Sequence, residues 1–290
     1  MVHGGADRHR TRSVGVSRPR AAGVRRPVVL VTGASSGIGA AAAGLLAASG
    51  HTVFGASRRG SAPPGVHPLC IDVEDEASVR AGVEQVTSAQ GRLDVVVNSA
   101  GWGLAGAVET TPIEEAMAQL ETNLWGVVRV TRAALPALRA GGDGLVVNVS
   151  SLGGVFAVPF QAYYSASKFA LEGWSEGLAY EVAPFGVGVT LVEPGNIRSG
   201  FTAGRRHASG AEDPPYGDAY RRALDQMERD ELAAVGPEAV AKVIARVVAA
   251  RRPPRRVTAG SASERRSVLL RRLLPTRVFE HLAAKAMLGE

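Results

Sequence analysis

From residue 27 onward the sequence alternates short apolar runs with longer helical segments, and this rhythm constrains the fold more than any other feature. Because the apolar runs are unbroken, both faces of each strand should be buried, as in a parallel sheet covered by helices. A single doubly wound α/β domain follows, since no internal repeat or long linker interrupts the alternation. Strands are expected at residues 28–31, 52–56, 67–71, 93–97, 145–149 and 187–192, and helices at 38–49, 76–89, 113–139 and 164–182.

Positive charge is concentrated at the two ends of the chain. Residues 1–26 hold seven arginines and one aspartate, and residues 250–290 hold ten Lys/Arg against three Asp/Glu. The body between them, residues 27–249, is acidic, with 16 basic and 23 acidic side chains. Nucleic-acid binding is therefore not expected. We expect residues 1–26 to be a disordered basic tail and residues 27–290 to be the folded domain.

Cys70 is the only cysteine of the chain. One thiol can form neither an internal disulfide nor a cysteine-based metal site, so no metal is expected. Cys70 closes an apolar run, which favours a buried strand residue over a redox role. No stretch approaches the roughly 20 apolar residues of a membrane span. A reducing, cytoplasmic location is the natural expectation.

A glycine-rich loop, TGASSGIG at residues 32–39, separates the first expected strand from the first expected helix. Glycines allow a tight turn and a close approach of the backbone to a pyrophosphate, while the helix N-terminus offers free N–H groups. A purely structural turn is the alternative, but the position of the loop is the one that a Rossmann-type dinucleotide site requires. The expected cofactor-binding residues here are Gly33, Ser35, Ser36, Gly37, Ile38 and Gly39.

The end of the second expected strand indicates which dinucleotide binds. An NAD site usually carries an acidic residue at this point, for the ribose 2′-hydroxyl. Ser57 stands there instead, and Arg58 follows it. A guanidinium can hold a 2′-phosphate by charge-assisted hydrogen bonds, whereas a carboxylate would repel it. We therefore expect Ser57 and Arg58 to belong to an NADP(H) site; a solvated charged turn is the alternative.

Tyr164 and Lys168 stand four residues apart at the start of an expected helix, which places both side chains on one face. A free tyrosine is a poor base at neutral pH. A nearby ammonium and a positively charged nicotinamide would lower its pKa and make it a proton carrier. The neighbouring Tyr163 has Ser167, not a lysine, four residues later, so Tyr164 is the candidate.

Together these segments resemble the short-chain dehydrogenase/reductase family, whose cofactor fingerprint is TGxxxGxG and whose catalytic motif is YxxxK. The resemblance extends over about residues 27–250 and implies a catalytic tetrad. Ser151, thirteen residues before Tyr164, takes the place of the family's catalytic serine, in preference to Ser150. Asn123 takes the place of the asparagine that holds a water between Lys168 and solvent. Read without the family, Asn123 would be a structural helix residue.

The resemblance also implies further cofactor contacts. The pair after the third strand lies beside the adenine, and the segment after the fourth strand matches NNAG, with Ser99 replacing the second asparagine. The segment after the sixth strand matches PGxxxT, which holds the nicotinamide carboxamide, with Ser199 replacing the threonine. The residues so implied are Asp72, Val73, Asn98, Ala100, Gly101, Pro194, Gly195, Ile197 and Ser199, together with Tyr164 and Lys168.

The implied function is NADP(H)-dependent interconversion of an alcohol and its ketone or aldehyde. Two alternatives stay open: a non-enzymatic NADP(H)-binding regulator on the same fold, and a nucleotide-sugar epimerase or dehydratase. The stretches 167–173 and 184–187 resemble the hydroxysteroid and retinol dehydrogenase branch, and a substrate lid is expected near residues 200–231. A lipophilic substrate is favoured by five candidate wall residues: Trp102, Leu152, Phe156, Phe160 and Phe201.

The basic extension 251–290 has two interpretations. One is a last sheet strand at 257–259 followed by a capping helix with a solvated basic face. The other is a basic amphipathic helix that makes weak peripheral contact with anionic lipid. The resemblance also implies a homodimer or homotetramer that pairs the helices bearing Asn123 and Tyr164.

Overall fold

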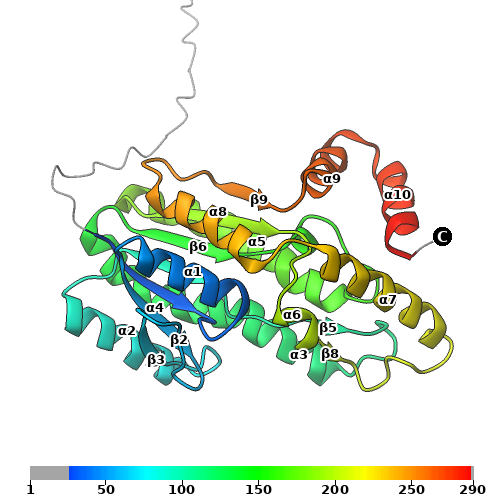
Figure 1. Cartoon of the computed structure of the whole chain (residues 1–290), viewed down its shortest axis with the longest axis horizontal. Helices are drawn as coiled ribbons and strands as arrows, with labels where there is room; N and C mark the ends of the chain where they lie inside the picture. Colours follow the sequence, from blue (N-terminus) through cyan, green and yellow to red (C-terminus); the bar gives the residue numbers. More distant parts are fainter. Residues whose placement is uncertain (1–25, 289–290) are drawn as a thin grey trace, which may run out of the picture.

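In the computed structural model, which describes residues 26–288, a seven-stranded parallel sheet forms the centre of the molecule (Figure 1). Its spatial order is β3-β2-β1-β4-β6-β7-β9, and every neighbouring pair is parallel. From β1 the chain adds β2 and β3 on one side and then crosses over to add β4, β6, β7 and β9 on the other side. The gap between β1 and β4 is the switch point where such folds bind ligands. The strands are β1 (Val28–Thr32), β2 (Thr52–Ser57), β3 (His67–Cys70), β4 (Val95–Asn98), β6 (Leu145–Val149), β7 (Gly188–Pro194) and β9 (Arg256–Ala259).

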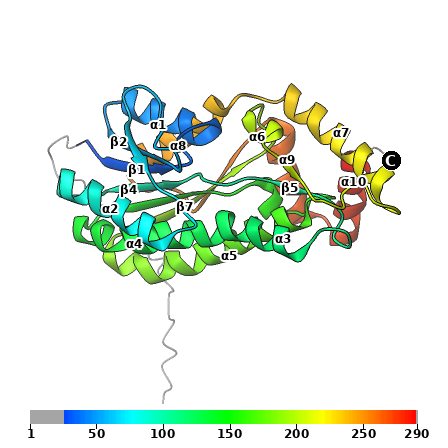
Figure 2. The same cartoon turned by 90° about the horizontal axis from the view of Figure 1, so that it is seen from below.

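Helices cover both faces of this sheet, as Figure 2 shows. On one face, α1 (Gly37–Ala48) and α8 (Pro237–Ala249) pack their buried residues onto the strands. On the other face lie α2 (Glu76–Gln90), α4 (Val127–Gly141) and α5 (Ala162–Val182). The two layers bury both sides of β1 and β6 completely, which explains their unbroken apolar sequences. The predicted fold class is confirmed.

Local signals set the ends of these helices. Asp75 caps α2 by accepting hydrogen bonds from the backbone N–H groups of Ala77 and Ser78. At their C-termini, α2 and α4 stop at Gly91 and Gly142, which adopt the left-handed conformation that glycine accepts without strain.

The expected helix over residues 113–139 is interrupted. It consists of α3 (Ile113–Leu120), the π-helical turn η1 (Glu121–Gly126) and α4. At the end of this turn, a Cβ on Gly126 would lie 2.8 Å from Cγ2 of Val73, so the helix approaches the strand-end loop as closely as the backbone allows. π-Turns of this kind are frequent at functional sites. This one contains Asn123.

Beyond the carboxyl edge of the sheet, the chain adds a second layer of short elements. The strands β5 (Leu104–Ala105) and β8 (Arg206–His207) pair, and α6 (Gly200–Ala203) and α7 (Gly217–Ala233) fall within the expected lid. The C-terminal segment forms α9 (Ala262–Leu273) and α10 (Thr276–Leu288), with α10 against α7. Short 3-10 turns occur at η2 (Leu152–Gly154) and η3 (Ala183–Phe185).

Cys70 is exposed, so the expectation of a buried strand residue was wrong. The reason is that β3 is an edge strand, in which only Leu69 faces the core. The expected tail lies outside the described residues, apart from Arg26. Within residues 26–288, no helix combines the length and the apolar character needed to cross a bilayer.

Candidate active site

One cavity of about 750 Å³ opens at the carboxyl ends of the central strands. It brings together nearly all of the site residues expected from the sequence. Those that line it are Gly33, Ser35, Ser36, Gly37, Ile38, Gly39, Ser57, Arg58, Asp72, Val73, Ala100, Gly101, Ser151, Tyr164, Lys168, Pro194, Gly195, Ile197 and Ser199.

The glycine loop has the geometry that a pyrophosphate needs. Gly33 and Gly37 have φ values of +69° and +55°. A Cβ on Gly33 would lie 2.9 Å from the backbone of Ala100, so the loop packs tightly against the segment after β4. In contrast, a Cβ on Gly37 would meet nothing within 4 Å, and Gly37 begins α1 at the cavity wall. A residue without a side chain thus leaves the helix N-terminus open to an anion, which fits the phosphates of a dinucleotide.

At the end of β2, Ser57 and Arg58 differ in their surroundings. The hydroxyl of Ser57 is committed to Ser61, donating to its carbonyl and accepting from its N–H at 2.9 Å each. Arg58 is exposed at the cavity wall, and within residues 26–288 its guanidinium forms no ion pair. A free cation without a neighbouring carboxylate partner fits a phosphate better than a ribose hydroxyl.

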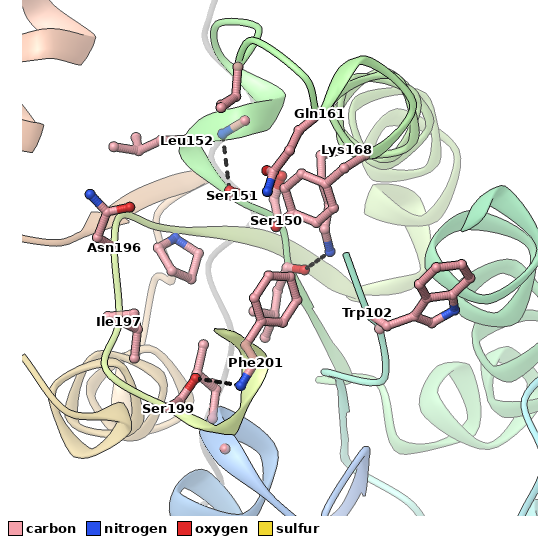
Figure 3. A pocket seen from close by; sticks show the side chains of 18 of the residues that line it. Trp102, Ser150, Ser151, Leu152, Gln161, Lys168, Asn196, Ile197, Ser199 and Phe201 are labelled. Atoms are coloured by element: carbon pink, nitrogen blue, oxygen red, sulfur yellow. Dashed lines mark hydrogen bonds between the residues drawn. The ribbon is translucent and has the colours of Figure 1, made fainter. Parts of the chain in front are cut away.

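The residues of the YxxxK motif are buried together on α5. Lys168 Nζ donates a hydrogen bond to the carbonyl oxygen of Val149 at 3.0 Å and lies 5.8 Å from the ring centroid of Tyr164. Ser151 follows β6, and its Oγ accepts a hydrogen bond from the N–H of Gly153 at 3.0 Å. In Figure 3 Ser151 and Lys168 flank the same part of the cavity.

Burial shifts the proton affinities of this pair in opposite directions. It raises the pKa of Tyr164 to about 12, although a hydrogen bond with Ser151 partly offsets the rise. It lowers the pKa of Lys168 to about 8, with the Glu172 carboxylate acting against it. Desolvation of the phenolate thus outweighs the effect of the neighbouring protein groups, and the expected lowering, which includes the charge of an oxidised nicotinamide, stays a prediction.

Two of the expected site residues do not line the cavity. Asn98 is buried behind it and donates to Thr131 Oγ1 at 3.0 Å and Asn148 Oδ1 at 2.8 Å. Asn123 is fully buried in η1; its amide accepts from the N–H of Trp102 and donates to the carbonyl of the same residue. Both asparagines hold the strand-end loops in place. A Cβ on Gly101, which lines the cavity, would lie 3.0 Å from Asn123 Oδ1, so Asn123 lies directly behind this glycine.

Comparison with known proteins fits this geometry. The family model for short chain dehydrogenases matches residues 27–210. The chain belongs to the short-chain dehydrogenase/reductase family. It is similar to the 3-ketodihydrosphingosine reductase of Bacteroides thetaiotaomicron, with 43% identity over 80% of this chain and 87% of the relative. It is also 40% identical to 17-beta-hydroxysteroid dehydrogenase type 1 of Homo sapiens, over 61% of this chain and 58% of that protein.

Solved structures of short-chain dehydrogenases have the same fold. A short-chain dehydrogenase from Streptomyces avermitilis superimposes with a TM-score of 0.78 and 35% identity, over 90% of this chain and 97% of that one. This short-chain dehydrogenase/reductase is thus an oxidoreductase that acts on CH–OH groups and the corresponding carbonyls with a nicotinamide cofactor.

The substrate end of the dehydrogenase includes residues that the sequence did not reveal. Of the expected wall residues, Trp102, Leu152, Phe156 and Phe201 line the cavity. Phe160 does not: it packs against Tyr220, with ring centroids 5.7 Å apart. Gln161 is a buried polar residue in this wall, and its amide donates a hydrogen bond to Met227 Sδ at 2.9 Å.

The C-terminal helices of the dehydrogenase also form part of the wall. Glu264 lies at the cavity, and five residues of α10 lie at the outer end of it: Phe279, Leu282, Ala283, Ala286 and Met287. The pattern Ser261-x-x-Glu264 is a capping box that marks the start of α9. It gives no indication that the helix returns to the cavity.

Proposed function

We propose that this protein interconverts a lipophilic ketone and its secondary alcohol with NADP(H), using Tyr164 as the proton donor and acceptor. The observation that carries the proposal is the burial of Tyr164 and Lys168 side by side in a cavity with the glycine loop at one end and an apolar wall at the other. Tyr164 would thus be within reach of both the bound cofactor and the substrate.

The residues of the site divide the chemistry between them. The bound cofactor would supply or accept a hydride at the substrate carbon. With a pKa raised to about 12, the Tyr164 phenol carries its proton at neutral pH and can donate it to the carbonyl oxygen during reduction. Ser151 would hold the same oxygen by its hydroxyl. Lys168, through its ammonium, would favour the phenolate that forms.

The preference for NADP(H) rests on Arg58. Its exposed guanidinium stands at the end of β2, where Ser57 and Arg58 take the place of the carboxylate that binds a ribose 2′-hydroxyl in NAD sites. Gly33, Gly37 and the N-terminus of α1 would hold the pyrophosphate, and the loop after β7 would hold the nicotinamide.

The substrate class rests on the wall. Trp102, Leu152, Phe156 and Phe201 line the same cavity as Tyr164, whose ring packs edge-on against Phe201 at 5.8 Å between centroids. Two relatives, named for a ketodihydrosphingosine and for a hydroxysteroid, point to lipophilic ketones and alcohols as well.

NADPH oxidation against a panel of lipophilic ketones tests the proposal. Tyr164→Phe should abolish turnover while leaving cofactor binding intact. Tyr163→Phe is the matched control, because the Tyr163 hydroxyl donates to the carbonyl of Val108 at the surface and Tyr163 does not line the cavity. Tight NADPH binding without turnover of any ketone would instead favour a cofactor-binding regulator.

A second proposal concerns assembly. Met117 on α3, Trp125 on η1 and Phe169 on α5 are large apolar side chains left exposed on the helices that bear Asn123 and Tyr164. Apolar patches of this kind usually mark an interface. We propose that two or four copies pair through this face.

A further inference from the structure

The mouth of the cavity is built by the two C-terminal helices. Leu270 of α9 and Leu282 of α10 both line the cavity, and yet they remain 43% and 49% exposed. They therefore form its rim. Phe279 closes the wall behind them, with its ring 5.6 Å from that of Phe156. A lipophilic molecule that enters here meets apolar side chains from the surface inward.

The outer face of α9 continues this apolar rim away from the cavity. Leu269 and Leu273 are 54% and 70% exposed, and their spacing of four places them on one face of the helix. Val268 is the only buried residue that α9 contributes to the core. Val278, at the start of α10, is exposed as well. Within residues 26–288, these side chains thus present apolar surface that no other part of the protein covers.

Arginines border these leucines. Arg265, Arg266, Arg272 and Arg277 are all exposed, and within the described chain none of them forms an ion pair with a carboxylate. The neighbouring Arg271 lies over the Phe279 ring at 5.6 Å. The surface of α9 and of the start of α10 is thus both leucine-rich and basic. We call the surface formed by these five arginines of α9 and α10 and by the neighbouring apolar residues the rim surface. Its apolar residues are Leu269, Leu270, Leu273, Val278 and Leu282.

We propose that the rim surface docks on an anionic lipid bilayer and opens the cavity toward the hydrocarbon layer. Basic amphipathic helices bind such membranes by inserting apolar side chains while arginines contact lipid phosphates. A lipophilic substrate could then pass from the bilayer to Tyr164 without crossing water. This last step rests on the proposed function, whereas the docking itself does not.

The charge argues for lipid rather than for a second copy of the chain. In a symmetric pair the same surface faces itself, so the four arginines of each copy would meet like charges. Glu264, an acidic residue of α9, is already occupied by the backbone N–H groups of Ser261 and Asn196. Phosphates of anionic lipid supply the missing counter-charge.

Co-sedimentation of the full chain with vesicles tests the docking without substrate or cofactor. Vesicles of phosphatidylcholine alone are compared with vesicles that also contain phosphatidylglycerol. We expect binding only to the anionic vesicles, weakened by salt. The double variants Leu269→Gln/Leu273→Gln and Arg266→Gln/Arg272→Gln should each reduce the partition coefficient by about tenfold or more. These side chains do not line the cavity, so turnover of a water-soluble ketone should be retained.

Leu232→Gln is the matched control, because Leu232 is an equally exposed leucine on α7, outside the rim surface. Failure of the wild type to bind anionic vesicles at low salt would overturn the proposal. Binding that is unchanged in both double variants would also overturn it, since another basic segment would then be responsible. If the wild type does not bind vesicles and the double variants have a lower molar mass than the wild type in light scattering, the rim surface would instead be assigned to a second copy of the chain. Loss of turnover by Tyr164→Phe with vesicle binding intact separates this test from that of the catalytic proposal.

Discussion

Glu264 accepts a hydrogen bond from the backbone N–H of Asn196 at 2.6 Å and thereby ties α9 to the loop that follows β7. Its second carboxylate oxygen accepts from the N–H of Ser261, also at 2.6 Å. One side chain therefore caps a C-terminal helix and fixes the segment proposed to hold the nicotinamide. The contact is close: a Cβ on Gly195 would lie 2.3 Å from the Glu264 carboxyl group.

This contact predicts that Glu264→Gln weakens NADPH binding and lowers stability. An amide cannot accept hydrogen bonds from two N–H donors on opposite sides as a carboxylate does, which should cost about 1–3 kcal/mol in the free energy of unfolding. Urea unfolding and the KM for NADPH measure the two effects. Gly195→Ala should raise the KM for NADPH and lower stability, because the new methyl group collides with Glu264. Glu264→Ala in the same chain should reverse part of both effects. Additive effects of the two substitutions would contradict the coupling.

The lowered pKa of Lys168 predicts a pH-dependent stability. The neutral amine is favoured in the folded protein, so this contribution is present above the unfolded pKa of 10.5 and is lost as the pH falls through about 8. Between pH 7.5 and 9.5 the free energy of unfolding of the wild type should rise by about 2 kcal/mol relative to Lys168→Met. Lys242→Met, at an exposed position on α8, is the control and should follow the wild type. Equal pH slopes for the wild type and Lys168→Met would refute the assignment.

Arg58→Ala should lower kcat/KM for NADPH by about tenfold to a hundredfold and leave kcat/KM for NADH unchanged, since charge-assisted hydrogen bonds to the 2′-phosphate are lost. Steady-state kinetics with both cofactors measure the change. Arg59→Ala is the matched control, because Arg59 is exposed but does not line the cavity. An unaltered cofactor preference in Arg58→Ala would argue that the arginine is a solvated turn residue.

Trp125→Arg should reduce the molar mass of the protein in light scattering to that of a single chain. The substitution places a charge among the exposed apolar side chains Met117, Trp125 and Phe169, where burial against a second copy would be costly. Leu232→Arg, on a different surface, should leave the molar mass unchanged. A wild type that is already a single chain at micromolar concentration would contradict the pairing.

Local patterns allowed the core of this fold to be predicted from the sequence. The strands at β1 and β6 and the glycine loop at Gly33–Gly39 are each encoded by adjacent residues, so their type and order could be read directly. The position of Tyr164 and Lys168 on one helix face follows from helical spacing in the same way.

Features that depend on tertiary neighbours could not be read so easily. The run that ends at Cys70 resembles a core strand, and only the spatial order of the sheet makes β3 an edge. The π-turn at Asn123 ends where Gly126 packs closely against Val73, a neighbour distant in sequence. The pKa of Tyr164 depends on burial by Phe201 and other residues distant in sequence. Contacts between Glu264 and Asn196 span 68 residues, for which the sequence holds no local signal.

The two ends of the cavity come from different parts of the sequence. The dinucleotide end of the cavity is built mainly from residues 33–101, whereas its outer end comes from residues 201–287. The glycine-loop end of the cavity and its outer end are therefore encoded in separate stretches of the gene, with Ser151, Tyr164 and Lys168 between them. Replacement of α10 by another helix would exchange the molecules admitted to Tyr164, whereas α9 would have to keep Glu264, which fixes the loop after β7. α10 would thus be an exchangeable element for selecting substrates, held in place by a helix that also supports the cofactor loop.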